Sequence, residues 1–232
     1  MKAYDLNWIQ LEDYLQRDDR IVVPLGSTEQ HAYLSLGTDA ILAERVANEA
    51  AESLGVPVLP ALPYGLTPKF AAFPGSPSLR VETFLAVVRD LLDSLHGQGF
   101  RRIFLLNGHG GNAPAGNLAE DWSSEREDGQ ALYHEWFGPK TYAVIREIEP
   151  DGQHASWWEN FPWTRLAGVD VPEESKPPMD QAAYRAADAA GVRALIGDGS
   201  FGGPYARPPE DLERVWATAV AEAREALESG WR

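Results

Sequence analysis

The chain has 232 residues, of which 44% are hydrophobic and 24% charged, and this size suits one α/β domain over residues 1–232. It contains no cysteine, which excludes disulfide scaffolds, cysteine nucleophiles, cysteine-bound zinc and iron–sulfur clusters. Its formal charge of −15 disfavours nucleic acids and anionic membranes as partners, because both are negatively charged.

Neither a signal peptide nor a membrane span is predicted. The opening segment MKAYDLNWIQLEDYLQ carries acidic residues where a signal peptide needs an apolar stretch. Apolar runs such as 103–106 are far shorter than the ~20 residues that cross a bilayer. We therefore expect a soluble protein of the cytoplasm.

Short β-rich segments alternate with longer helical patterns along the chain. Helices are predicted at 8–15, at 38–54, from a cap at Ser78 to Gly97, from residue 113 to about Glu125, and at roughly 209–228. Strands are predicted at 20–25, 56–59, 102–106 and 131–136. Residues 141–167 are predicted to be less regular, and 172–180 to form a loop. This alternation favours a mostly parallel sheet with helices on both faces, whose ligands lie beyond the C-terminal ends of the strands.

A first polar cluster directly follows the strand at 20–25. Glu29 and His31 are two residues apart, so in an extended chain their side chains project to the same side. Asp39 returns to the same strand end at the start of a helix. Two carboxylates and an imidazole that converge in this way suit a metal ion. The alternative is ordinary loop polarity, with Asp39 as a helix cap.

A second cluster, the loop NGHGGN at 107–112, follows the third predicted strand. Its glycines permit a sharp turn and leave His109 unobstructed at the edge of the sheet. A glycine-rich loop can also bind phosphate, but neither G-x-G-x-x-G nor the P-loop lysine pattern is present. A metal ligand is therefore favoured over a phosphate site.

A third cluster is DGQHASWWE at 151–159. If this segment is helical, His154 and Glu159 both line one cleft without touching each other. The alternative is an aromatic-rich surface turn. Adjacent tryptophans near Phe161 and Trp163 favour a pocket wall or a contact with another subunit. The remaining histidines, His96 and His134, are predicted to be structural.

In this order, the motifs GSTEQH, GTD, NGHGGN and DGQHASWWE resemble those of the creatininase (creatinine amidohydrolase) family. Segments 63–79 and 197–205 are also similar to that family. The resemblance implies a three-layer α/β/α fold, a centre of two divalent metal ions, and a ring-like homo-oligomer such as a hexamer. It implies that Glu29 and His109 bind one ion, that His31 and Glu159 bind the other, and that Asp39 bridges them.

The resemblance further assigns His154 as proton donor or acceptor. We expect Asp151 either to orient the His154 imidazole or to bind substrate. Two divalent ions and three carboxylates leave one positive charge, which a hydroxide ion would neutralise. That hydroxide is the nucleophile that a hydrolase needs. Carboxylate and imidazole ligands suit zinc, manganese or iron.

The chain departs from the family at positions expected to face the substrate. Its segment EQHAYLSLGTD is one residue shorter than the family pattern and carries Tyr33 where a second histidine is missing. Phe70 stands where the family often has histidine, and Trp157 where glutamate is common. We expect these residues and Trp158 to contact the substrate, and creatinine itself is disfavoured.

Three functions are compatible with these residues. The first is a metal-dependent hydrolase that opens a small cyclic amide or lactam. The second keeps the same metal site but hydrolyses a carbon–carbon bond of a cyclic diketone, as in cyclitol (inositol-type) catabolism. The third is a catalytically silent metal- or ligand-binding protein, which the shortened loop between Glu29 and Asp39 would favour by displacing Asp39.

Overall fold

The computed structural model describes residues 1–231 and contains a parallel three-stranded sheet. Its strands are β1 (Arg20–Leu25), β2 (Arg102–Asn107) and β3 (Gln130–Glu135), in the order β1-β2-β3. The register pairs Leu25 with Asn107 and Asn107 with Glu135, so the C-terminal ends of all three strands lie at one edge. This is the edge at which ligands are expected.

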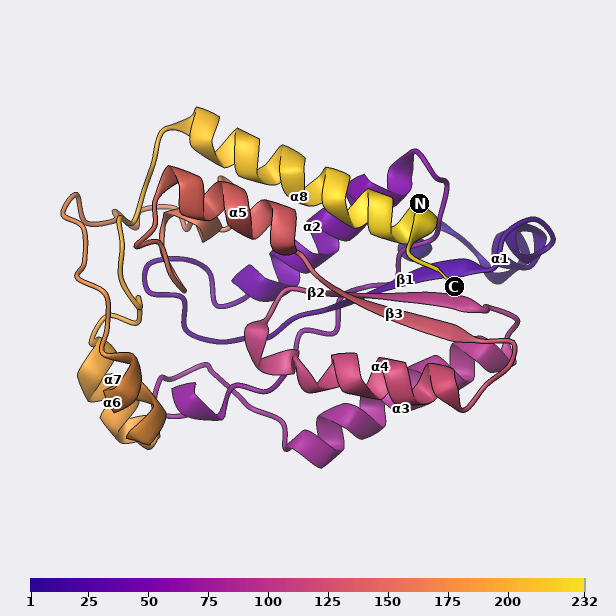
Figure 1. The fold of residues 1–232 in the computed structure, drawn as a ribbon, viewed down its shortest axis with the longest axis horizontal. Helices are drawn as coiled ribbons and strands as arrows, with labels where there is room; N and C mark the ends of the chain where they lie inside the picture. Colours follow the sequence, from indigo (N-terminus) through magenta and orange to yellow (C-terminus); the bar gives the residue numbers. More distant parts are fainter. Residues whose placement is uncertain (232) are drawn as a thin grey trace.

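Helices cover both faces of the sheet (Figure 1). The helices of the chain are α1 (Trp8–Leu15), α2 (Thr38–Glu52), α3 (Val81–Gly97), α4 (Pro114–Ser124), α5 (Pro139–Ile148), α6 (Gln181–Ala186), α7 (Ala189–Ile196) and α8 (Pro209–Ser229), of which α6 and α7 lie away from the sheet. Helices α2, α5 and α8 pack together on one face, and α3 and α4 on the other. The predicted three-layer α/β/α fold is confirmed.

Alternation along the strands explains why both faces are covered. In β1, Val22 joins the core on the α2 and α8 side, while Ile21 and Val23 join the core on the α3 and α4 side. In β2, Phe104 and its neighbour Leu105 divide in the same way. Successive side chains point to opposite faces, so a continuous apolar run is buried on both sides, as in other parallel sheets.

Residues 56–59 do not form the strand that was predicted. Only Val58 is bridged, to Val22 and to Lys2. Prolines at 57 and 60 flank this residue and have no N–H to donate, so a regular ladder cannot extend through them.

Two further predictions for the helices were wrong. Helix α3 begins at Val81 with Arg80 as its N-cap, and the Ser78 hydroxyl instead accepts a hydrogen bond from the Thr67 backbone. The segment 141–167, predicted to be irregular, contains most of α5, whose Thr141 and Ile145 are buried one turn apart. Helices α6 and α7 were not anticipated.

The aromatic residues near 157–163 pack inside this chain. Trp157, Trp158 and Phe161 belong to the core beside α2 and α8, and Trp163 stacks on Phe161 with ring centroids 5.2 Å apart. They therefore need no neighbouring subunit to cover them. Separately, none of the helices in residues 1–231 has the length and apolar character needed to cross a membrane.

Candidate dinuclear metal centre

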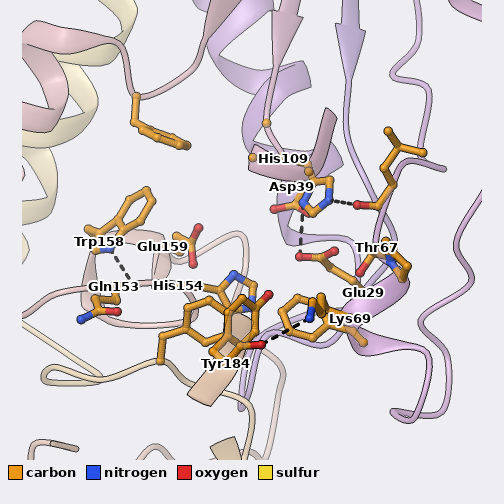
Figure 2. Close-up of a pocket in the computed structure, with 18 of the residues that line it drawn as sticks. Glu29, Asp39, Thr67, Lys69, His109, Gln153, His154, Trp158, Glu159 and Tyr184 are labelled. Carbon is orange, nitrogen blue, oxygen red and sulfur yellow. Dashed lines mark hydrogen bonds and ion pairs between the residues drawn. The ribbon is translucent and has the colours of Figure 1, made fainter. Parts of the chain in front are cut away.

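Five buried acidic and histidine side chains meet at the C-terminal edge of the sheet. Glu29 and His31 lie in the loop after β1, and Asp39 lies in the first turn of α2. His109 follows β2, and Glu159 ends a short 3-10 helix that begins at Trp157. Figure 2 shows Glu29, Asp39 and His109 side by side.

The five side chains form two groups of three that share Asp39. Oδ2 of Asp39 lies 3.0 Å from Nδ1 of His109, which lies 3.3 Å from Oε1 of Glu29. Oδ1 of Asp39 lies 3.1 Å from Nε2 of His31, which lies 4.0 Å from Oε2 of Glu159. The shortened loop thus leaves Asp39 between the two groups. Each group has the donor types of a site for one divalent cation.

The unpaired atoms of the cluster also fit cations. Glu29 Oε2 is buried and has no hydrogen-bond partner in residues 1–231, while the buried His31 Nε2 and Asp39 Oδ2 have only the ion-pair contacts at 3.1 Å and 3.0 Å given above. Buried polar atoms without partners are costly, and a shared cation would satisfy several at once. It would also offset the repulsion among three buried carboxylates. The residues therefore fit a pair of divalent ions.

Without a cation, this cluster retains protons. Burial opposes a charged imidazolium, yet Asp39, Glu159 and Glu29 raise the pKa of His31 to about 10. Burial likewise opposes a charged Asp39, but His31 and His109 hold the pKa of this carboxyl well below its usual value. Burial raises the pKa of Glu159 to about 7, against the attraction of His31. An ion that binds here must displace protons from the histidines.

A chain of hydrogen bonds orients His109. Nε2 of its ring lies 2.9 Å from the carbonyl oxygen of Leu66, which leaves Nδ1 directed at Glu29 and Asp39. The Leu66 N–H donates to Asn112 Oδ1, and Asn112 Nδ2 donates to Asn107 Oδ1. The loop fits tightly: a Cβ on Gly108 would lie 2.1 Å from the Asp39 carbonyl oxygen, so only glycine is tolerated there.

Asn107 continues this network to the end of β3. Its Nδ2 donates to the His109 carbonyl at 2.6 Å and to Glu135 Oε2 at 2.7 Å. Oε1 of Glu135 accepts a hydrogen bond from the Tyr133 hydroxyl. The sequence did not point to Leu66 or Glu135, because neither belongs to a recognisable motif.

His154 lies beside the cluster, in a pocket wall. Its ring stacks on Phe70 at 5.1 Å and lies 4.5 Å from the ring of His31. Burial, followed by the positive charge of His31, holds the pKa of His154 well below its usual value. Two atoms of Gln30 lie near Nε2 of the His154 ring. The side-chain amide nitrogen of Gln30 is 3.0 Å away, and the backbone carbonyl oxygen of Gln30 is 3.2 Å away. Gln30 therefore serves either tautomer of His154, and one ring nitrogen of His154 also lies within 4.8 Å of ligand atoms of Glu29 and His31.

A strained backbone supports Glu159. Ala155 has φ of 56°, in the left-handed region that side chains other than glycine rarely adopt. In this conformation its N–H donates to Glu159 Oε2 at 2.6 Å. The segment 151–159 is therefore a turn followed by the short 3-10 helix, in place of the helix considered from the sequence. Strain of this kind is concentrated at functional sites.

A pocket of about 820 Å³ opens over the cluster. Glu29, Asp39, His109, His154 and Glu159 all line it. Phe70 and Trp158, predicted to contact substrate, are also in its wall. Leu66, Lys69, Arg146, Gln153, Tyr184 and Phe201 line it as well and were missed. The sequence offers little signal for them, since they are scattered between residues 66 and 201.

Three residues expected to act on or contact the substrate do not line this pocket, and neither does the predicted ligand His31, which is fully buried beside Asp39 and Glu159. Tyr33 packs edge-on against Tyr205, with ring centroids 5.5 Å apart. Trp157 is fully buried in the core on the α2 and α8 side. Asp151 is exposed, and no contact joins its carboxylate to His154 within residues 1–231. The predictions for these three positions are therefore corrected.

His96 and His134 are remote from the cluster. His96 pairs with Asp128 at 3.0 Å, and His134 stacks on Phe104 at 5.8 Å. Both contacts agree with the structural roles predicted for these residues.

The family model for creatininase, described as creatinine amidohydrolase, matches residues 4–227. The chain belongs to the creatininase family. It is 32% identical over 112 residues to a creatinine amidohydrolase of Pseudomonas putida. The matched region covers 45% of this chain and 43% of that protein. It is 33% identical over 103 residues to a 3-dehydro-scyllo-inosose hydrolase of Thermotoga maritima. This second matched region covers 44% of this chain and 33% of that protein. The matched segments thus span less than half of these curated relatives.

Solved structures extend the likeness over the whole fold. A crystal structure of creatinine amidohydrolase superposes with a TM-score of 0.76 at 25% sequence identity. The superposition covers 99% of this chain and 97% of the other. The relatives just described bear the names of two different hydrolases, so membership of the family leaves the substrate open.

Proposed function

We propose that this chain is a hydrolase that uses two divalent metal ions to open a small cyclic amide. The observation that carries the proposal is the pair of three-residue groups sharing Asp39, at the floor of a pocket large enough for an organic substrate. Two divalent ions held there would polarise a carbonyl group and lower the pKa of water toward neutrality.

The residues divide the remaining work among them. Glu29 and His109 would hold one ion, His31 and Glu159 the other, and Asp39 both. His154, neutral because its pKa is low, would take a proton at Nδ1 and release it to the leaving nitrogen. Gln30 supports this role, because Nε2 of His154 keeps a hydrogen-bond partner in either tautomer. Phe70 would hold the imidazole in place by stacking.

Metal content and ring opening test this proposal together. We expect about two zinc, manganese or iron ions per purified chain, as the two groups imply. Cyclic amides incubated with the loaded protein should gain the mass of one water, and a chelator should abolish the reaction. A well-folded protein that takes up no divalent ion would contradict the proposal. Two bound ions without turnover of any substrate would favour the silent binding protein.

A second candidate is hydrolysis of a carbon–carbon bond in a cyclic diketone. It is favoured by the Thermotoga maritima relative and by the aromatic walls of the pocket, where Phe70, Tyr184 and Phe201 offer faces to a polyhydroxylated ring. His154 would then protonate an enolate in place of an amine. Mass spectrometry on cyclitol diketones and cyclic amides, offered in parallel, separates the two activities.

A homo-oligomer such as a hexamer and a cytoplasmic location stay predictions. Sedimentation of the purified protein tests the first, and fractionation of cells tests the second.

A further inference from the structure

The charged residues of the pocket are distributed unevenly. The acids in its lining are Glu29, Asp39 and Glu159, and all belong to the candidate metal centre. The other charged residues in the lining are Lys69 and Arg146. Two divalent ions and one hydroxide would balance the three carboxylates, so Lys69 and Arg146 would leave the pocket with a surplus of positive charge. In a chain of net charge −15, the loaded pocket is therefore a positively charged site that attracts anions.

Lys69 is fixed by backbone carbonyls and has no acidic partner within residues 1–231. Its Nζ donates to the carbonyl oxygens of Tyr184 at 3.3 Å, Arg185 at 3.2 Å and Ala187 at 2.6 Å. Figure 2 shows the ammonium beside Tyr184. An ammonium has three N–H donors, and all are used here. Lys69 thus contributes charge to the pocket, while its donors hold the end of α6 against the wall.

Arg146 differs from Lys69 because it has donors to spare. It lies in the last turn of α5, exposed at the pocket, and its Nη1 donates to the Pro150 carbonyl oxygen. No carboxylate pairs with it in the part of the chain described here. The Nε and Nη2 edge of the guanidinium is left open, and that edge matches a carboxylate with two parallel hydrogen bonds.

We propose that the substrate carries a carboxylate and that Arg146 binds it. This inference rests on the proposed function and narrows its substrate to an organic anion whose scissile carbonyl lies toward the metal centre. The apolar part of such a molecule fits between Phe70, Trp158 and Phe201. A volume of about 820 Å³ leaves room for a ring together with an anionic substituent. Neutral or cationic cyclic amides lack the group that Arg146 would recognise.

Dihydrouracil and dihydroorotate provide a matched pair of probes, since they share one cyclic amide ring and differ by a single carboxylate. Isothermal titration of the manganese-loaded protein should show dihydroorotate binding roughly tenfold more tightly, as expected for a charge-assisted hydrogen bond. Arg146→Gln should abolish this preference, and Arg146→Lys should retain part of it.

Arg193→Gln is the control. Arg193 is also an exposed arginine held by a backbone carbonyl, that of Ala72, but it does not line the pocket. It should keep the full preference for dihydroorotate. Thermal unfolding of each variant shows whether the fold is intact.

Salt gives a second measurement that does not depend on variants. The advantage of dihydroorotate should shrink between about 0.01 M and about 1 M salt, as the Debye length falls from about 30 Å to about 3 Å. Equal binding of the two probes, no measurable binding of dihydroorotate, or a preference that Arg146→Gln retains would each overturn the inference.

Ring opening of the same two probes separates this inference from the proposed function. If dihydroorotate is preferred through Arg146 but no cyclic amide is ever opened, the carboxylate site stands and the hydrolase proposal fails. If cyclic amides are opened without regard to their charge, the hydrolase proposal stands and the carboxylate site fails.

Discussion

Asp39 is the residue on which both halves of the site depend. Each of its oxygens faces a different histidine, at 3.1 Å and 3.0 Å. Its neighbours in sequence also fix it, because the Thr38 hydroxyl donates to the Ser35 carbonyl at the start of α2. If Asp39 bridges two ions, as proposed, it would couple the occupancy of the two groups.

Replacing Asp39 tests that coupling. Asp39→Asn should weaken the binding of both ions by more than about 100-fold, because an amide nitrogen cannot bind a cation. Metal analysis after dialysis checks the result, with the exposed Glu147→Gln as control. Retention of two tightly held ions by Asp39→Asn would contradict the shared position.

The pH dependence of metal binding follows from His31. Its pKa of about 10 in the absence of an ion means that the imidazole is protonated below that pH, whereas a cation binds only the unprotonated ring. Affinity for manganese should therefore rise as pH increases from about 6 to about 9. Titration calorimetry in buffers of different ionisation enthalpy would also detect the released protons. A flat profile would speak against His31 as a ligand.

Individual residues were predictable from the sequence to different degrees. Glu29, Asp39 and His109 were found because each sits at the end of a strand or the start of a helix, where topology alone brings side chains together. Trp157 and Tyr33 were misplaced because the direction of a side chain in a turn depends on backbone angles that composition does not reveal.

At the scale of elements, the ends of β2 and β3 act as one support for His109. Asn107 at the end of β2 bonds to Glu135 at the end of β3, and Asn112 carries the connection on to Leu66. The orientation of one imidazole is thus fixed by the register of two strands.

Asn112→Ala should break this support. We expect about a 10- to 100-fold loss of affinity for the ion bound by Glu29 and His109, with a smaller effect on the ion near His31. Two-site titration with manganese measures both affinities. Asn117→Ala, an exposed change in α4, should leave both unchanged. Equal weakening of the two sites would argue for general loosening instead.

Elements were predicted well where one signal dominated. The apolar stripe of α3 and the apolar runs of β1 and β2 gave their locations to within a few residues. The strand predicted at 56–59 does not form. Its valines favour a strand, but its prolines lack the N–H that a ladder of hydrogen bonds needs. Helix α5 was missed because it buries only Thr141 and Ile145, too few positions to reveal a helical period.

For the whole molecule, two adjacent aromatic residues differ in what they contribute. Trp157 is fully buried in the core on the α2 and α8 side, and its neighbour Trp158 belongs to the same core but also lines the pocket. Trp157 therefore serves the fold alone, whereas Trp158 serves both the fold and the pocket.

This difference predicts different outcomes for the same substitution. Trp157→Ala should lower the free energy of unfolding by about 3–5 kcal/mol, because it leaves a large cavity in the core. Trp158→Ala should also destabilise the fold, because Trp158 packs on Trp136 and Phe137, and it should in addition raise KM for a substrate of the pocket. Denaturant unfolding and steady-state kinetics on both variants check this assignment. A raised KM in Trp157→Ala but not in Trp158→Ala would refute it.

Two glycines hold the start of α2 against the sheet. A Cβ on Gly26 would lie 2.5 Å from Cα of Ala40, and one on Gly108 would meet the Asp39 carbonyl. Backbone therefore rests directly on backbone at the floor of the pocket, with no side chain between them to repack. The rim is built differently, from single side chains of α5, α6 and the segment around Lys69. New substrate specificity is therefore expected to evolve by exchange of residues at the rim, while the reactive centre beneath stays the same.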